Sequence, residues 1–154
     1  MVIQLLVGSF VSVINIMVHA LATVAAISIA RRAGFKPALR PRLHLMSVMV
    51  ATVLVLMLAH TIEIVVWSLS YALVGATPDG SELLYFAFVN YTTLGYGDVT
   101  PVKAWQLLGP MAAMNGILMF GWSTAVLFEV LLKTIEHLGA IAAPGSPFSA
   151  GDRG

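Results

Sequence analysis

The chain of 154 residues contains no cysteine, which excludes a disulfide framework and thiol chemistry. Charged residues are scarce as well, at 10% of the sequence, whereas a soluble domain carries about 25%. The net charge of +1 gives no basis for a nucleic-acid partner. Because 59% of the residues are hydrophobic and the mean hydropathy is +0.93, the composition indicates a membrane protein.

The groups needed for catalysis are also missing. No pairing of a nucleophile with a base is recognisable. His60 and Glu63 are candidate metal ligands on one helical turn, but two ligands are too few for a metal site. We therefore predict that the protein is not an enzyme and has no cofactor.

Three apolar segments are each long enough to cross a bilayer as a helix, for which about 20 residues suffice. They cover residues 1–30, 44–74 and 104–136. A signal peptide is the alternative for the first segment. It lacks a positively charged start, however, and its apolar run is about twice the usual length. We interpret it as a retained transmembrane helix.

The loop at residues 31–43 is strongly basic. Five of the eight Lys and Arg residues lie in it: Arg31, Arg32, Lys36, Arg40 and Arg42. Short basic loops stay in the cytoplasm, so we expect a multi-pass protein of the plasma or inner membrane. Its N-terminus would lie outside, and a flexible tail at 138–154 would lie in the cytoplasm. The same cations are candidates for contact with anionic lipids.

The apolar run at residues 81–92 is too short to span a bilayer and predicts a re-entrant helix. The orientation given by the basic loop makes it enter from the outer side, with its C-terminus inside the membrane. A helix C-terminus carries about half a negative charge. Several such helices aimed at one point would favour a cation.

A polar stretch with alternating glycines, Gly95 and Gly97, follows this short helix. Glycine tolerates backbone angles that let successive carbonyls point the same way. The residues at 93–98, Thr-Leu-Gly-Tyr-Gly-Asp, resemble the selectivity-filter signature of the potassium-channel family. The usual pattern has Val where this chain has Leu94. The similarity is to tetrameric pore domains of the prokaryotic type, with one extra N-terminal helix.

The resemblance implies an all-α membrane protein with three transmembrane helices, a re-entrant pore helix and a filter loop, assembled as a homotetramer. The pore domain would cover 44–137, with outer helix 44–74, pore helix 81–92, filter 93–98 and inner helix 104–136. Potassium would be the permeant ion and the only metal bound. Filter carbonyls replace the water around the ion, and here they belong to Thr93, Leu94, Gly95 and Tyr96, with Gly97 at the outer end.

The resemblance also assigns residues that support the filter. Asp98 would bond to groups behind it, with the Tyr85 hydroxyl as a candidate partner. Tyr85 and Phe86 would brace Tyr96, although ordinary packing is the alternative for both. Some relatives place a second acid on the pore helix, where this chain has Val89.

Along residues 104–136, Gly116 is a candidate gating hinge, and close packing is its alternative. Ser123 and Thr124 are candidates to line the cavity. Glu129 would attract cations at the inner mouth, or would pair with Lys133 four residues later.

His60 and Glu63 share one face of the second helix and form a candidate pH sensor. Glu63 could instead be hydrated near the outer interface or bonded to the periphery of the filter. On the first helix, Asn15 and His19 share a face and are expected to form interhelical hydrogen bonds.

The sequence thus predicts a passive, potassium-selective channel. Two alternatives stay open. One is a non-selective cation channel of the same fold, against which the intact Gly95-Tyr96-Gly97 argues. The other is a non-conducting membrane subunit that regulates a larger channel.

Overall fold

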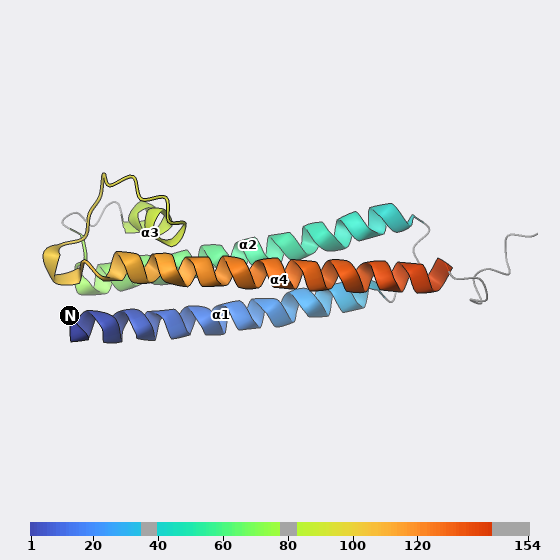
Figure 1. Cartoon of the computed structure of the whole chain (residues 1–154), viewed down its shortest axis with the longest axis horizontal. Helices are drawn as coiled ribbons and strands as arrows, with labels where there is room; N and C mark the ends of the chain where they lie inside the picture. Colours follow the sequence, from blue (N-terminus) through green and yellow to red (C-terminus); the bar gives the residue numbers. More distant parts are fainter. Residues whose placement is uncertain (35–39, 78–82, 143–154) are drawn as a thin grey trace, which may run out of the picture.

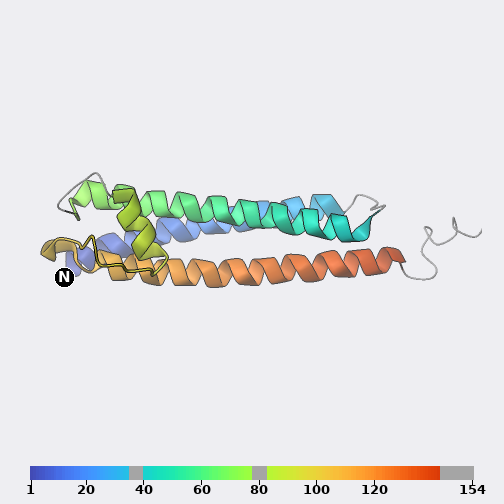
Figure 2. The ribbon, with the colours of Figure 1, turned by 90° about the horizontal axis from the view of Figure 1, so that it is seen from above.

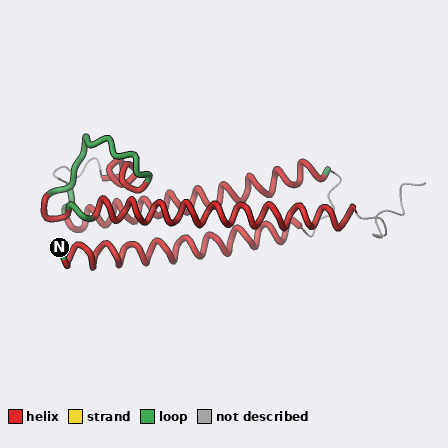
Figure 3. Tube along the Cα trace, viewed as in Figure 1, coloured by secondary structure: helices red, strands yellow, loops and turns green. Residues whose placement is uncertain are grey.

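A computed structural model describes residues 1–34, 40–77 and 83–142. Within these ranges the regular elements are helical: α1 (Val2–Gly34), α2 (Pro41–Val74), α3 (Leu83–Tyr91), a 3-10 turn η2 (Lys103–Trp105) and α4 (Leu108–Ala142). Figure 3 shows helices and loops but no strand over this part of the chain. Three segments are long and apolar enough to cross a membrane: Val2–Arg32, Pro41–Val74 and Lys103–Gly139. The predicted all-α membrane fold with three spanning helices is confirmed.

The helices form three layers. The long helices α1, α2 and α4 run side by side, and α3 lies at the end of the bundle that carries the N-terminus (Figure 1). Both α1 and α3 contact α2 and α4, and Figure 1 shows α1 and α3 on opposite sides of that pair. Seen from above, α3 crosses α2 and α4 at a steep angle (Figure 2). The filter segment therefore lies at the opposite end of the molecule from the end of α1 and the start of α2.

The helix boundaries differ from the sequence expectations at several ends. Helix α1 continues to Gly34, so Arg31 and Arg32 belong to its last turn instead of a loop. Helix α2 begins at Pro41 and includes Arg42. Lys36 lies outside the described residues. At the other end α4 begins at Leu108 and continues to Ala142, so the expected tail does not begin at residue 138.

Local sequence explains where these helices begin and end. Pro41 occupies the first turn of α2, where its missing N–H costs nothing. Gly75 ends α2 in the left-handed conformation, with φ 62°, and its N–H is bonded to the carbonyl of Ala72. Pro110 stands in the first turn of α4, so it interrupts no hydrogen bond along that helix.

The most tightly packed region lies where α2, α3 and α4 meet. Trp67, Tyr71, Phe86, Tyr91 and Leu108 are almost completely buried there. Elsewhere the long helices expose many apolar side chains, as expected for surfaces that face lipid or other subunits. The core thus holds the short helix α3 rigidly against two spanning helices.

Candidate functional site: the filter segment and the buried cluster behind it

The short helix α3 ends in a Schellman motif that leads directly into the filter segment at 93–98. The Thr93 N–H donates to the Asn90 carbonyl at 3.0 Å, and the Leu94 N–H donates to the Val89 carbonyl at 2.9 Å. Thr93 is the left-handed residue of this motif, with φ 60°. Glycine is usual at such a position, and a threonine there costs about 1–3 kcal/mol. The chain therefore leaves the helix in a strained turn at the first filter residue.

The sign of φ alternates along the filter segment. Thr93, Gly95 and Gly97 have φ of 60°, 61° and 78°, whereas Leu94 and Tyr96 have negative φ. Such alternation allows successive carbonyl groups to point to the same side of the chain, and glycine adopts it without a steric penalty. The two glycines therefore stand where the backbone requires them.

In the single chain the filter segment is open on one side. Residues 92–98 are all exposed, and the side chains of Leu94 and Tyr96 are 54% and 68% exposed. The Leu94 side chain is thus not packed against other residues to any large extent within one chain. The segment therefore lies at the surface of the single chain.

Asp98 accepts a hydrogen bond from the Tyr85 hydroxyl, with 2.6 Å between the hydroxyl oxygen and Oδ2. The bond expected between these residues is therefore present, and it joins the beginning of α3 to the end of the filter segment. The Tyr85 hydroxyl lowers the pKa of the Asp98 carboxyl from its ordinary value, with backbone N–H donors adding to the effect. Asp98 is therefore ionised at neutral pH.

Phe86 does not brace the filter segment. Its side chain is 2% exposed and packs on Tyr71 of α2, with 5.0 Å between the ring centroids. The expected role beside Tyr96 is wrong for Phe86 within one chain, because α3 turns this side chain toward α2. Its alternative, ordinary core packing, describes it correctly.

Gly116 lies against the last residue of α3. A Cβ atom added to Gly116 would stand 2.0 Å from the Tyr91 carbonyl oxygen. Helix α4 runs through Gly116 without interruption, so the structure supports the close-packing interpretation, and a hinge at this residue stays a prediction. Gly121 has no neighbour within 4 Å of such an atom.

The polar residues farther along α4 point in different directions. Ser123 is 7% exposed and faces the bundle interior, so its expected place on a pore wall is wrong. Thr124 is exposed and bonds to the Phe120 carbonyl. Glu129 pairs with Lys133 at 2.6 Å, with about half of each side chain exposed. This pair is the alternative that the sequence offered for Glu129.

Ser123 belongs to a buried cluster behind α3. The imidazoles of His19 and His60 both bond to the Glu63 carboxylate, at 2.8 Å and 3.2 Å. Glu63 also accepts from the Tyr91 hydroxyl. The Nε2 atoms of His60 and His19 lie 2.9 Å and 3.3 Å from Ser123 Oγ. Four helices thus contribute to one polar cluster.

This cluster decides between the alternatives for Glu63. Its side chain has no exposed surface, so the hydrated alternative is wrong. The bond to Tyr91 supports the alternative that Glu63 contacts the periphery of the filter. A pH-sensing role for His60 and Glu63 stays a prediction.

The contact of His19 with Glu63 was not foreseen from the sequence. The signal available was Asn15 four residues before His19, which places both on one face of α1. Both form the expected interhelical hydrogen bonds, since Asn15 Nδ2 donates to Asn115 Oδ1 at 2.9 Å. Trp67 Nε1 donates to the same oxygen at 3.2 Å. These bonds hold α1 against α2 and α4 at the level of the pore helix.

Comparison with known families agrees with this geometry. A family model described as an ion channel matches residues 50–133. The chain belongs to this ion-channel family, of the two-helix, potassium-channel type. The matched range contains most of α2 and α4 together with α3 and the filter segment, and leaves α1 outside. No curated protein and no solved structure matches the chain.

The assignment of α3 as the pore helix, α2 as the outer helix and α4 as the inner helix of the channel unit stays a prediction, and these names are kept for the three helices below. The buried cluster joins all three to α1, which is an addition to that unit.

Proposed function

We propose that this channel conducts potassium selectively through a pore formed by four copies of the chain. The carbonyls of Thr93, Leu94, Gly95 and Tyr96, together with the Thr93 hydroxyl, would replace the water around the ion. Gly97 would form the outer end. The observation that carries the proposal is the alternation of φ from Thr93 to Gly97, which lets successive carbonyls face one side.

Assembly follows from the same segment. One chain offers one column of carbonyl oxygens, so enclosing an ion requires several copies around an axis, and closed cyclic symmetry is the usual solution. The exposure of residues 92–98 supports this arrangement. The orientation proposed has the filter segment and the N-terminus outside and the end of α4 in the cytoplasm. The end of α1 and the start of α2, which carry Arg31, Arg32, Arg40 and Arg42, lie at the end opposite the filter segment (Figure 1).

Potassium flux and reversal potentials, measured across lipid membranes that contain only the purified protein, test the proposal. We expect potassium flux and a reversal potential that follows the potassium gradient in mixed potassium and sodium. A reversal potential insensitive to exchanging the two ions would establish the non-selective channel instead. A stable tetramer without flux would favour the regulatory subunit.

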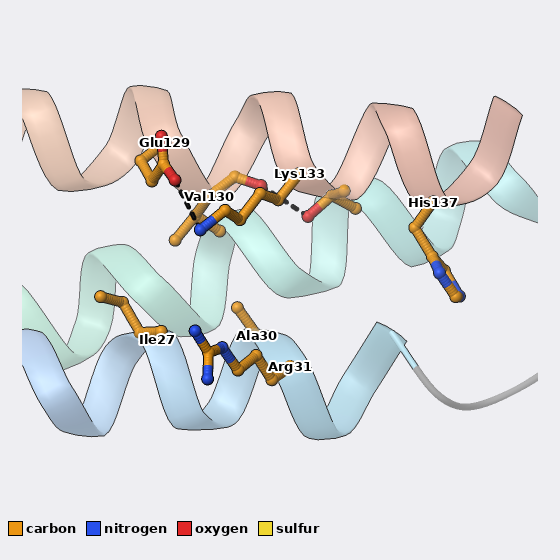
Figure 4. A pocket seen from close by; sticks show the side chains of 8 residues that line it. Ile27, Ala30, Arg31, Glu129, Val130, Lys133 and His137 are labelled. Carbon is orange, nitrogen blue, oxygen red and sulfur yellow. Dashed lines mark hydrogen bonds and ion pairs between the residues drawn. The ribbon is translucent and has the colours of Figure 1, made fainter. Parts of the chain in front are cut away.

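We also propose anionic lipid as a partner at the cytoplasmic end. A pocket between α1 and α4 is lined by Ile27, Ala30, Arg31, Glu129, Val130, Lys133, Thr134 and His137. In Figure 4, Arg31 extends from α1 toward the Glu129–Lys133 pair on α4. Cations above an apolar wall suit a lipid phosphate with its acyl chain. Vesicles containing anionic lipid should raise the unfolding temperature of the wild type more than that of Arg31→Gln. An equal rise in both proteins would contradict the lipid proposal.

A further inference from the structure

The buried cluster behind the pore helix brings together four groups that bind metal ions. His19 comes from α1, His60 and Glu63 from α2, and Tyr91 from α3. One ligand atom from each of His19, His60 and Glu63 lies within 4.8 Å of the others, and all three residues are buried. The Tyr91 hydroxyl lies 3.1 Å from His60 Nδ1. Counting only His60 and Glu63 gave too few ligands, because His19 is 44 residues away from Glu63 in the sequence.

Both imidazoles are oriented in the same way. Each turns Nδ1 toward the Glu63 carboxylate, at 2.8 Å for His19 and 3.2 Å for His60. Each turns Nε2 toward Ser123 Oγ, at 3.3 Å and 2.9 Å. In metal sites the ligating histidine donates its second ring N–H to an oxygen, which fixes the tautomer and the ring orientation. The Ser123 Oγ atom is the oxygen that faces the second nitrogen of both rings.

Counting hydrogens shows where a cation can enter the cluster. A hydroxyl has one hydrogen and two lone pairs, and a neutral imidazole has one N–H and one lone pair. If both Nδ1 atoms carry hydrogen and donate to Glu63, Ser123 can donate to only one Nε2. If both Nε2 atoms carry hydrogen, Ser123 accepts from both, but two Nδ1 lone pairs then face the carboxylate. If His19 donates from Nδ1 to Glu63 and His60 donates from Nε2 to Ser123, the His60 Nδ1 lone pair alone faces the Glu63 carboxylate and the Tyr91 hydroxyl. A metal ion would bind that lone pair.

The donor set and its spacing suit a small divalent ion. Zinc is bound by nitrogen and oxygen at about 2.0–2.1 Å in a tetrahedron, which separates neighbouring ligand atoms by about 3.3 Å. Three contacts among these groups, of 2.8, 3.2 and 3.1 Å, lie close to that separation. The Tyr91 hydroxyl lies closer to Glu63, and the ligand atoms of His19, His60 and Glu63 all lie within 4.8 Å of one another. Two imidazoles, a carboxylate and a phenolate oxygen, formed when the Tyr91 hydroxyl releases its proton to solvent on metal binding, then supply four ligands.

We propose that His19, His60 and Glu63, with Tyr91 as the fourth ligand, form a site for a divalent transition metal of the zinc class. Ser123 is a positioning residue that orients both imidazoles. The metal joins α1 to the last residue of the pore helix and so stabilises the base of the filter segment. The site is independent of which ion the pore conducts.

Metal content measures the proposal directly. The protein would be purified in detergent with a tag that contains no histidine, loaded with Zn²⁺, desalted and analysed by mass spectrometry. We expect a single zinc ion per chain in the wild type and none in His19→Gln. The matched control is His44→Gln with His137→Gln, which removes the same residue type outside the cluster and should keep the metal.

Two further measurements hold even if His19→Gln fails to fold. Co²⁺ should give the visible absorption of a tetrahedral nitrogen and oxygen site in the wild type. Ser123→Ala should bind metal about 10–100-fold more weakly, as loss of an outer partner does. A folded wild type that stays free of metal after loading would overturn the proposal. Loss of metal from the control variant would also overturn the proposal. Neither the metal content nor the absorption spectrum depends on ion flux. Absence of metal binding can therefore be told apart from absence of the proposed channel activity.

Discussion

The Tyr91 hydroxyl donates a hydrogen bond to the Glu63 carboxylate, and this bond joins the last residue of the pore helix to the outer helix. Glu63 is bonded in turn to His19, which lies on α1. The end of the pore helix is therefore connected to a helix that the channel unit does not include. The filter segment begins two residues after Tyr91, so the connection bears on the geometry of the filter.

Tyr91→Phe removes this bond and keeps the aromatic ring. We expect the free energy of unfolding to fall by about 1–3 kcal/mol, because a buried acceptor loses a donor. Thermal unfolding in detergent measures the loss. Tyr71→Phe is the matched control, since Tyr71 is equally buried but its hydroxyl donates to the Leu108 carbonyl at the long distance of 3.5 Å. Equal losses in both variants would contradict a special role for Tyr91.

Gly116→Ala tests the contact between the inner helix and the pore helix. The new Cβ atom would stand 2.0 Å from the Tyr91 carbonyl oxygen, so α4 must move away. We expect a loss of about 1–3 kcal/mol in stability, as overpacking causes, together with reduced flux. Gly121→Ala is the control: it meets nothing within 4 Å and should stabilise the helix by about 0.5–1 kcal/mol. A hinge without close packing predicts instead that Gly116→Ala folds as stably as the wild type.

The spans and the short helix α3 could be predicted from the sequence because each depends on local features. The length of an apolar run separates a spanning helix from a re-entrant one. The filter is predicted from six consecutive residues, and the backbone angles of Gly95 and Gly97 agree with the reason given for those glycines. The i,i+4 spacing of Glu129 and Lys133 likewise suffices to predict their ion pair.

The buried cluster could not be predicted in full because it depends on packing between distant helices. His19 and Ser123 are 104 positions apart, yet they share a hydrogen bond. Helix α4 is apolar on most sides, so its sequence does not reveal which face meets a pore and which meets α1. For this reason Ser123 was assigned to a cavity wall that it does not line. Phe86 was misplaced for a similar reason, because one helical step on α3 separates the side facing α2 from the side facing the filter.

The hydrogen bond between Tyr85 and Asp98 joins the beginning of α3 to the end of the filter segment, and Tyr85→Phe removes this bond. If the proposed tetrameric potassium channel forms, we expect its flux to decay faster while the assembly stays intact, because the filter segment loses a hydrogen bond at its outer end. The decay of flux from liposomes measures this effect. Asp98→Ala should behave in the same way, and the double variant should be no worse than either single one. Additive effects would show that the two residues act independently.

Glu129→Gln tests whether the Glu129 carboxylate attracts cations at the inner mouth of the pore. Glu129 is half exposed and paired with Lys133, so we expect block by internal magnesium to be unchanged. Stability should fall by no more than about 0.5 kcal/mol, the usual value of an exposed i,i+4 pair. Lys133→Gln should have the same small effect on stability. Weaker magnesium block in Glu129→Gln alone would show that the carboxylate faces the permeation path after all.

Gly95→Ala tests the filter assignment itself. Space is available for the methyl group, whose nearest neighbour is the Thr93 carbonyl oxygen at 4.0 Å. The cost is instead conformational, about 1–2 kcal/mol for a left-handed alanine, and it can be relieved by rotating a carbonyl out of the column. We therefore expect potassium over sodium selectivity, measured from reversal potentials, to be lost. Gly75→Ala carries the same strain, at φ 62° with nothing within 4 Å, but lies at the end of α2. Gly75→Ala should lose a similar amount of stability and keep its selectivity. If Gly95→Ala also kept its selectivity, the assignment of residues 93–98 as the filter would be wrong.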